Sequence, residues 1–172
     1  MSGFGAYGGG RTRHGYPVTV HVYDLSPANP AILNPIGCGL HHSGVEVDGE
    51  EYSFAGGAGV YSDTPKQAAG ATYSHSIPMG TFEGSSADLR AAISDLRSDF
   101  GPDKYNILTK NCNHFSDALC SSLLSKSVPA YVNRAANWGS CFSCLFPDEV
   151  LGGAPVGPSG GSSSSGFQMM GG

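Results

Sequence analysis

Alternating apolar and polar positions predict strands in the first third of the chain. A first strand is expected to end at Asp24, because valine occupies every second position before it. These valines are Val18, Val20 and Val22, so the strand is expected to be half-buried, with His21 on the opposite, solvent-facing side. A second alternation begins near His42, and the Asp48-Gly49 pair that follows it is typical of a tight turn. The pattern therefore predicts a β-hairpin over residues 42–54.

Two later stretches place apolar residues at the 3.6-residue spacing of an amphipathic helix. The first helix is expected to begin at Ser85, whose spacing to Asp88 is typical of a capping pair, and to end at Gly101. The second begins after Asn111, a suitable N-cap residue. Their apolar faces contain Leu89, Ile93, Leu96 and Phe100 in the first helix, and Phe115, Ala118, Leu119 and Leu123 in the second. A short third helix is predicted over residues 128–136, with a proline near its start.

Glycine and serine dominate both ends of the chain. Residues 1–15 include six glycines and little apolar material, and the other end is similarly poor in core-forming residues. Such segments bury too little apolar surface to offset the entropy that ordering costs. We therefore expect a flexible N-terminus over residues 1–15, one domain over 16–146 and a disordered tail over 147–172.

The charge and cysteine content of the chain limit the classes of partner and the cellular compartment that we expect. The formal net charge is −5, and the nine Lys and Arg residues form no stripe, so nucleic acid is not expected as a partner. No apolar run approaches the length of a membrane-spanning helix, and the first residues lack the apolar core of a signal peptide. Five cysteines without a regular framework favour a reducing setting, which predicts a cytoplasmic location that can extend to the nucleus.

The stretch around Cys112 carries the candidate chemistry. With Asn111 as N-cap, Cys112 lies in the first turn of a helix, where free backbone N–H groups and the helix dipole favour thiolate over thiol. A thiolate is the nucleophile that acyl transfer needs. The neighbouring Asn113 argues against an ordinary buried cysteine. A base must complete the site, and His41 and His42 lie about seventy residues upstream.

Four separate stretches resemble the PPPDE family of papain-like thiol peptidases, which includes the desumoylating isopeptidases. They are the opening strand with its Tyr-Asp-Leu-Ser end (18–26), the histidine strand Gly-Leu-His-His-Ser-Gly-Val-Glu-Val (39–47), the cysteine motif Tyr-Asn-Ile-Leu-Thr-Lys-Asn-Cys-Asn-His-Phe (105–115), and the segment Val-Pro-Ala-Tyr-Val-Asn-Arg (128–134). The resemblance covers residues 17–137, and the cysteine motif is its most specific part. It implies an α+β, circularly permuted papain-like fold. In that fold a small antiparallel sheet packs against helices, one of which begins at the catalytic cysteine.

The resemblance also implies a site and a reaction. Cys112 would be the nucleophile and His42 the base of a Cys–His dyad that acts through an acyl-enzyme. The implied substrate is a protein conjugate of SUMO, ubiquitin or another ubiquitin-like modifier, and no cofactor or metal is expected. Candidate oxyanion donors are Asn111 and the backbone N–H of Cys112. Candidate groove residues are His41, Gly44 and Asn113, and a homodimer is left open.

Other interpretations stay open beside this one. The same dyad could hydrolyse thioesters and remove S-acyl groups from proteins, or the fold could bind a modifier without catalysis. A zinc site has suitable ligand types in Cys38, His41, His42, Cys112 and His114, although their spacing matches no familiar pattern. Cys141 and Cys144 lie beside apolar residues and a flexible tail, which makes them candidates for S-acylation and membrane association.

Overall fold

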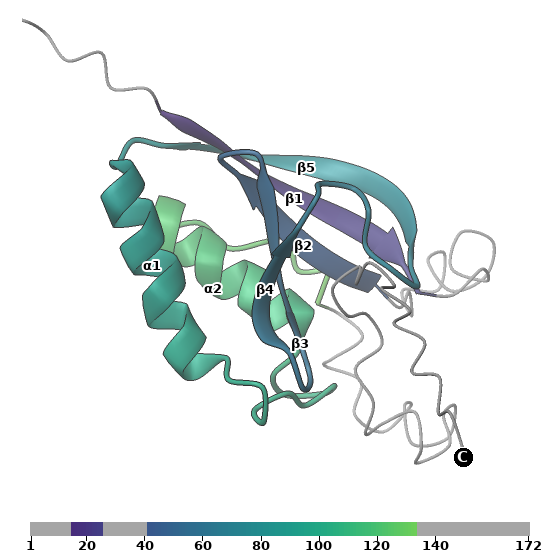
Figure 1. Ribbon diagram of the computed structural model, residues 1–172. Coiled ribbons are helices and arrows are strands. Elements are labelled where there is room, and N and C mark those ends of the chain that lie inside the picture. Colours follow the sequence, from purple (N-terminus) through teal and green to yellow (C-terminus); the bar gives the residue numbers. More distant parts are fainter. Residues whose placement is uncertain (1–14, 26–40, 134–172) are drawn as a thin grey trace, which may run out of the picture.

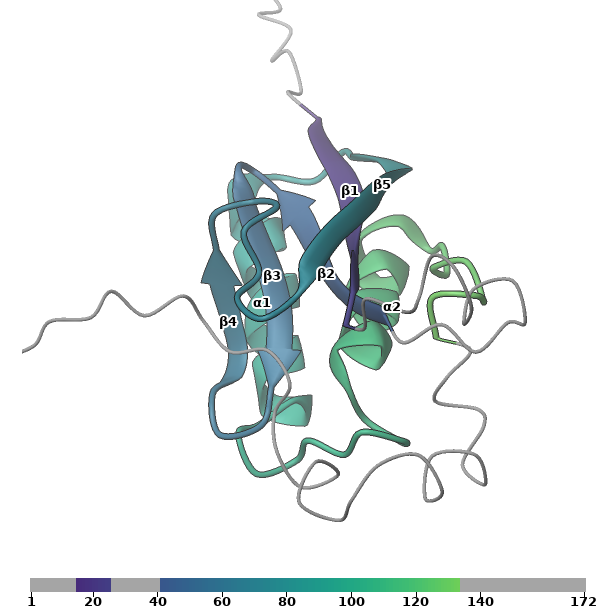
Figure 2. The same ribbon diagram turned by 90° about the vertical axis from the view of Figure 1, so that its right-hand side faces the viewer.

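A five-stranded antiparallel sheet with two helices on one face forms the body of the protein (Figure 1, Figure 2). The computed structural model describes residues 15–25 and 41–133. The strands are β1 (Tyr16–Asp24), β2 (His41–Val47), β3 (Glu50–Ala55), β4 (Gly59–Asp63) and β5 (Thr72–Phe82), and the helices are α1 (Ser86–Asp99) and α2 (Cys112–Leu124). The strand order is β4-β3-β2-β1-β5, with antiparallel pairing throughout. The predicted α+β class is confirmed.

The hairpin predicted over residues 42–54 is formed by β2 and β3. Val47 pairs with Glu50, and the two residues between them have positive φ angles, 56° at Asp48 and 79° at Gly49. Two consecutive left-handed residues make the type of turn whose twist matches that of the adjoining strands. Aspartate and glycine adopt this conformation at low cost, which is why the sequence signal was clear.

Both predicted helices begin where their capping residues indicated. The Ser85 hydroxyl accepts the Asp88 N–H at 3.2 Å, and the Asp88 carboxylate accepts the Ser85 N–H at 2.8 Å, which completes a capping box before α1. Asn111 caps α2. The third helix, predicted over residues 128–136, is wrong in its described part, up to residue 133. There the chain makes a single turn instead, closed by the Val132 N–H donating to the Pro129 carbonyl at 3.0 Å.

The core lies between the sheet and the two helices. It contains the valines of β1 and β2 together with aromatic and aliphatic side chains from β3 and the helices. The fully buried members include Val18, Val20, Val22, Val45, Val47, Phe54, Phe115 and Leu119. The ring of Phe100 meets Phe54 and Phe115 edge to face, with centroids 5.1 and 5.4 Å apart. This packing fixes the first turn of α2 against β2 and β3.

Residues 20–23 of β1 are buried on both faces, although the alternation predicted a polar face toward solvent. His21 was expected to be a solvent-facing strand histidine, and this is wrong, because its side chain is buried. Its ring nitrogens lie 2.8 Å from the Ser76 hydroxyl and 2.6 Å from the Glu46 carboxylate. Strands on both sides of β1 supply these partners, which offset the cost of burying a polar ring.

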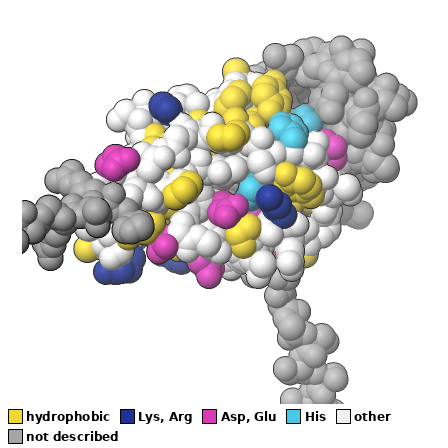
Figure 3. Space-filling view, turned by 90° about the horizontal axis from the view of Figure 1, so that it is seen from above, with side chains coloured by type: hydrophobic (Ala, Val, Ile, Leu, Met, Phe, Trp, Pro, Cys, Tyr) yellow, Lys and Arg dark blue, Asp and Glu magenta, His cyan; other side chains and the backbone are white. Residues whose placement is uncertain are grey.

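The described surface shows no concentration of positive charge on the face seen from above. In Figure 3 the basic side chains lie in separate places among acidic and apolar ones. This agrees with the net negative charge of the chain. Among the described residues, no helix is both long enough and apolar enough to cross a membrane.

Candidate active site

Cys112 is the first residue of α2, and its side chain is buried, with 3% of its surface exposed. The N–H groups of Asn113 and of Cys112 itself are directed at the sulfur, as expected in the first turn of a helix. A third N–H comes from Ser43 in β2. The thiol therefore lies where the start of α2 meets the start of β2.

The divergence of β2 from β3 explains how the thiol reaches Ser43. The two strands pair only over residues 45–47 of β2, so the earlier part of β2 has no backbone partner in β3. The Ser43 carbonyl instead accepts the Ser53 hydroxyl at 3.0 Å, and the Ser43 N–H is directed at the sulfur of Cys112. The Ser43 hydroxyl donates toward α2, to Asn113 at 2.7 Å. These contacts fix β2 directly above the nucleophile.

Burial keeps the Cys112 thiol protonated at neutral pH in this conformation. Desolvation raises the pKa of Cys112 to about 11, and the three N–H groups at the sulfur offset only part of that effect. The expectation that the helix start favours the thiolate is therefore wrong for this structure. The N–H groups at the helix start do lower the pKa as expected, but the sequence did not show that the thiol is enclosed.

A short pulse of iodoacetamide at pH 7.5 should consequently label Cys112 slowly. Cys120 provides the internal reference, since it is also buried in α2 and its pKa is raised to about 12 by burial and by Asp117. We expect the two thiols to react at similar low rates, and labelling of Cys112 to accelerate as the pH approaches 11. Mass spectrometry of the peptides measures both sites, and selective labelling of Cys112 at neutral pH would contradict the burial argument.

His42 is the second residue of β2, and its imidazole is buried, with 1% of its surface exposed. Strand alternation places it on the face of β2 opposite Ser43, and its ring packs against Tyr23, with centroids 5.6 Å apart. Neither ring nitrogen has a hydrogen-bond partner within the described ranges. Burial lowers the pKa of His42 to about 4, so the imidazole is neutral at pH 7 and able to accept a proton.

Tyr61 is a member of the site that the sequence did not reveal. It lines a small pocket with His42, and burial raises the pKa of its hydroxyl to about 12, with a further contribution from Cys112. The contribution of Cys112 means that its thiol lies within electrostatic range of Tyr61. An isolated tyrosine in a short strand carries no sequence signal for such a role.

The two asparagines beside Cys112 form hydrogen bonds that hold the start of α2 in place. The Asn111 side chain accepts the N–H groups of Asn113 and His114 and donates to the Ile107 carbonyl at 2.7 Å. We therefore assign Asn111 to the helix cap and not to the oxyanion. The Asn113 amide is buried, and it donates at 3.0 Å to the carbonyls of His41 and Val132. His114 completes the cap through its Nδ1, as expected of a capping residue.

Two predicted groove residues, Gly44 and His41, are enclosed by other side chains of the protein. A side chain at Gly44 would overlap the Glu51 carboxyl group, so the space beside it is taken by Glu51 and is not open to a substrate backbone. His41 is largely buried, with Nδ1 3.2 Å from the Asp24 carboxylate and its ring edge-on to Tyr131. Burial lowers the pKa of His41, and the Asp24 carboxylate opposes that shift.

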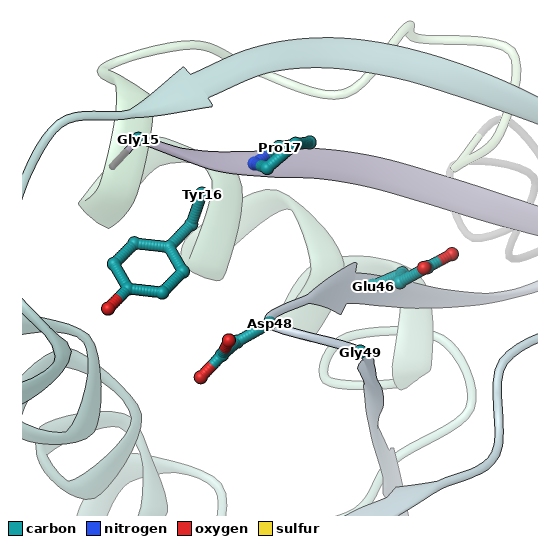
Figure 4. A pocket seen from close by; sticks show the side chains of 6 residues that line it. All are labelled: Gly15, Tyr16, Pro17, Glu46, Asp48 and Gly49. Carbon is teal, nitrogen blue, oxygen red and sulfur yellow. The ribbon is translucent and has the colours of Figure 1, made fainter. Parts of the chain in front are cut away.

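A larger and more open pocket lies at the other end of the sheet (Figure 4). Its volume is about 440 Å³, and it is lined by Gly15, Tyr16, Pro17, Glu46, Asp48 and Gly49. It contains neither the thiol nor an imidazole, so it offers no nucleophile for acyl transfer. Among the described residues, no three potential ligands are grouped closely enough to hold a metal ion. Cys38, Cys141 and Cys144 lie outside the described residues.

Comparisons with known proteins identify the family of this chain. Residues 16–150 match the family described as "PPPDE putative peptidase domain". The chain is 36% identical over 138 residues to a DeSI-like protein of Arabidopsis thaliana. The matched region covers 78% of this chain and 61% of that protein. It is 39% identical over 153 residues to a desumoylating isopeptidase 1 homolog of Caenorhabditis elegans. Here the matched region covers 83% of this chain and 46% of that protein.

The match to human desumoylating isopeptidase 1 is more distant but covers more of the relative. It is 28% identical over 142 residues, which cover 79% of this chain and 77% of the human protein. The chain thus spans between about half and three fifths of the length of the plant and nematode relatives. The family match extends over most of the sequence and includes both the histidine strand and the cysteine helix. The chain therefore belongs to the PPPDE peptidase family.

Proposed function

We propose that the protein is a cysteine isopeptidase that removes a ubiquitin-like modifier from protein conjugates, with Cys112 as nucleophile and His42 as general base and acid. The observation that carries the proposal is the contact between the Cys112 sulfur and the N–H of Ser43, the residue directly after His42. SUMO is the favoured modifier, because the relatives are named desumoylating isopeptidases. The order of histidine before cysteine along the chain fits a circularly permuted papain-like fold.

The reaction follows from the ionisation of the two groups. In the free protein both are neutral at pH 7, since the pKa of the thiol is about 11 and that of the imidazole about 4. Attack on the carbonyl carbon after the modifier's C-terminal glycine forms the C–S bond as His42 takes the thiol proton. His42 then returns this proton to the leaving amine, and the C–N bond breaks.

A water molecule completes the cycle by hydrolysing the thioester. His42 removes a proton from the water as its oxygen attacks the acyl carbon, and the thiol is regenerated when the C–S bond breaks and the sulfur takes the proton back. The negative oxygen that forms in each step needs hydrogen-bond donors. We assign one of them to the backbone N–H of Cys112, because it has no intrahelical partner and is directed at the sulfur beside which the negative oxygen forms.

Hydrolysis of SUMO carrying a fluorogenic amide at its C-terminal glycine tests this function. The wild-type protein should release the fluorophore with multiple turnovers, and Cys112→Ala should release none. Ubiquitin with the same leaving group and an S-acylated peptide serve as comparison substrates. Turnover of the S-acylated peptide alone would support a thioesterase, and binding of SUMO without turnover would support a non-catalytic module; either result would contradict the proposal.

A further inference from the structure

Glu51 is a buried carboxyl group on the same side of the sheet as His42. It lies in β3 with 5% of its surface exposed, which is unusual for a glutamate. The Tyr23 hydroxyl donates to its two oxygens at 2.8 Å, and the Lys66 N–H donates to Oε2 at 2.8 Å. These donors come from β1 and from the segment after β4, so three parts of the chain converge on one side chain.

The glycine in the neighbouring strand leaves the space that Glu51 occupies. A Cβ added at Gly44 would lie 2.7 Å from Glu51 Cγ and would overlap the carboxyl oxygen. Gly44 and His42 are separated by one residue in β2 and therefore point to the same face. The absence of a side chain at Gly44 thus allows the Glu51 carboxyl group to approach the His42 side of β2.

His42 and Glu51 line one small pocket. Its volume is about 10 Å³, close to the space that a single water molecule needs, and the hydroxyls of Ser53 and Tyr61 also border it. His42 is fully buried here, with both ring nitrogens unpartnered within the described ranges. Tyr23 connects the two groups a second time, since its ring packs on His42 and its hydroxyl holds Glu51.

We propose that Glu51, held by Tyr23, is a positioning residue that orients the His42 imidazole and stabilises the positive charge it gains during catalysis. The inference rests on the proposed function, in which His42 becomes an imidazolium after taking the thiol proton. A carboxyl group that fixes the tautomer and orientation of a catalytic histidine is the general arrangement in nucleophilic hydrolysis. We assign this interaction to the shared pocket, which has the size of one water molecule and is bordered by the polar groups of both His42 and Glu51.

Other titratable groups border the same pocket, and each is compared with Glu51 as a possible partner of His42. Asp63 also lines it, and its carboxylate accepts the Thr64 N–H at 2.8 Å. Tyr61 stays protonated at neutral pH, since its pKa is raised to about 12. Burial and, to a smaller extent, the charge of Glu46 raise the pKa of Glu51. The donors from Lys66 and Tyr23 and the nearby His21 oppose that shift. Glu51 is the carboxyl group that accepts a hydrogen bond from Tyr23, whose ring packs against His42.

Glu51→Gln tests the proposal, because it removes the charge and keeps the shape. We expect kcat for the SUMO substrate to fall about tenfold, which corresponds to one pKa unit of lost imidazolium stabilisation, with KM changed by less than about twofold. The acidic limb of the pH profile should move to lower pH, since a histidine without a nearby negative charge binds its proton less tightly. Nitrogen NMR at pH 7 should show a single His42 tautomer in the wild type and a mixture in the variant.

Two further variants and a control separate positioning from a structural effect. Glu51→Asp should restore part of kcat, and Gly44→Ala, which displaces the carboxyl group without altering its charge, should also mix the His42 tautomers. Glu46→Gln is the matched control, because Glu46 shares the face of β2 but pairs with His21 at 2.6 Å. It should leave kcat and the His42 tautomer unchanged.

The outcomes that would overturn the inference are separate from those that would overturn the function. If the wild type turns over SUMO and Glu51→Gln leaves kcat, the pH profile and the His42 tautomer unchanged, Glu51 is not a positioning residue. Faster alkylation of Cys112 in Glu51→Gln, with kcat and KM both altered, would show a structural role instead. If the wild type turns over no substrate, the proposed function fails, and the NMR comparison of wild type with Glu51→Gln and Gly44→Ala still decides the inference.

Discussion

Replacing His42 with alanine is expected to lower kcat for the SUMO substrate by about two orders of magnitude or more, the usual contribution of a general acid–base group. The variant retains the thiol but has no group to take its proton, and burial keeps the pKa of Cys112 at about 11. The steady-state rate of fluorophore release measures the effect. Because the alanine leaves a cavity, His42→Gln serves as a second variant of similar volume, and it should lose activity to the same extent.

His41→Ala is the matched control for this loss. His41 precedes His42 in β2 but points to the other face, where it contacts Asp24 and Tyr131. We expect His41→Ala to change KM or the melting temperature and to leave most of kcat. If His41→Ala abolishes turnover while His42→Ala has little effect, the catalytic histidine has been assigned one residue out of register.

Asn113→Ala is expected to lower the free energy of unfolding by about 2–4 kcal/mol, since two buried carbonyls lose their donor at once. The amide donates to His41 and Val132 and accepts the Ser43 hydroxyl at 2.7 Å, so it joins α2 to β2 and to the segment after α2. Urea denaturation followed by circular dichroism measures the change. Activity should fall as well, because these bonds hold β2 above the thiol.

Asn106→Ala provides the comparison for this stability effect. Asn106 is exposed, and its side chain accepts the N–H groups of Leu108 and Thr109 at 3.0 and 2.9 Å. Water can replace an exposed partner, so the loss should stay below about 1 kcal/mol. Equal losses for the two variants would mean that the buried amide of Asn113 does not hold the site together.

Much of the fold could be predicted from local patterns. The hairpin required two left-handed residues at its turn, and Asp48-Gly49 identified it. The capping residues Ser85 and Asn111 marked the starts of both helices. The segment from 128 lacked such a signal, and a proline near its start was not enough to make a helix in its described part.

The site was only partly predictable, because its properties depend on burial and on long-range contacts. The helix start at Cys112 was evident from the sequence, but the enclosure that raises its pKa to about 11 was not. Gly44 was noted as a place without a side chain, yet which group fills that place depends on how β2 pairs with β3. Glu51 has no motif around it, and only the tertiary structure brings it to the His42 side of the sheet.

The most direct measurement of the central claim uses SUMO with a carbon electrophile in place of its C-terminal carboxyl group. Binding places the electrophile at the thiol, so we predict complete labelling of Cys112, much faster than by iodoacetamide. Intact mass and peptide mapping should show one adduct on Cys112, formed slowly in His42→Ala and absent in Cys112→Ala. A probe that labels Cys120 equally, or leaves Cys112 unmodified while SUMO binds, would contradict the Cys112–His42 site.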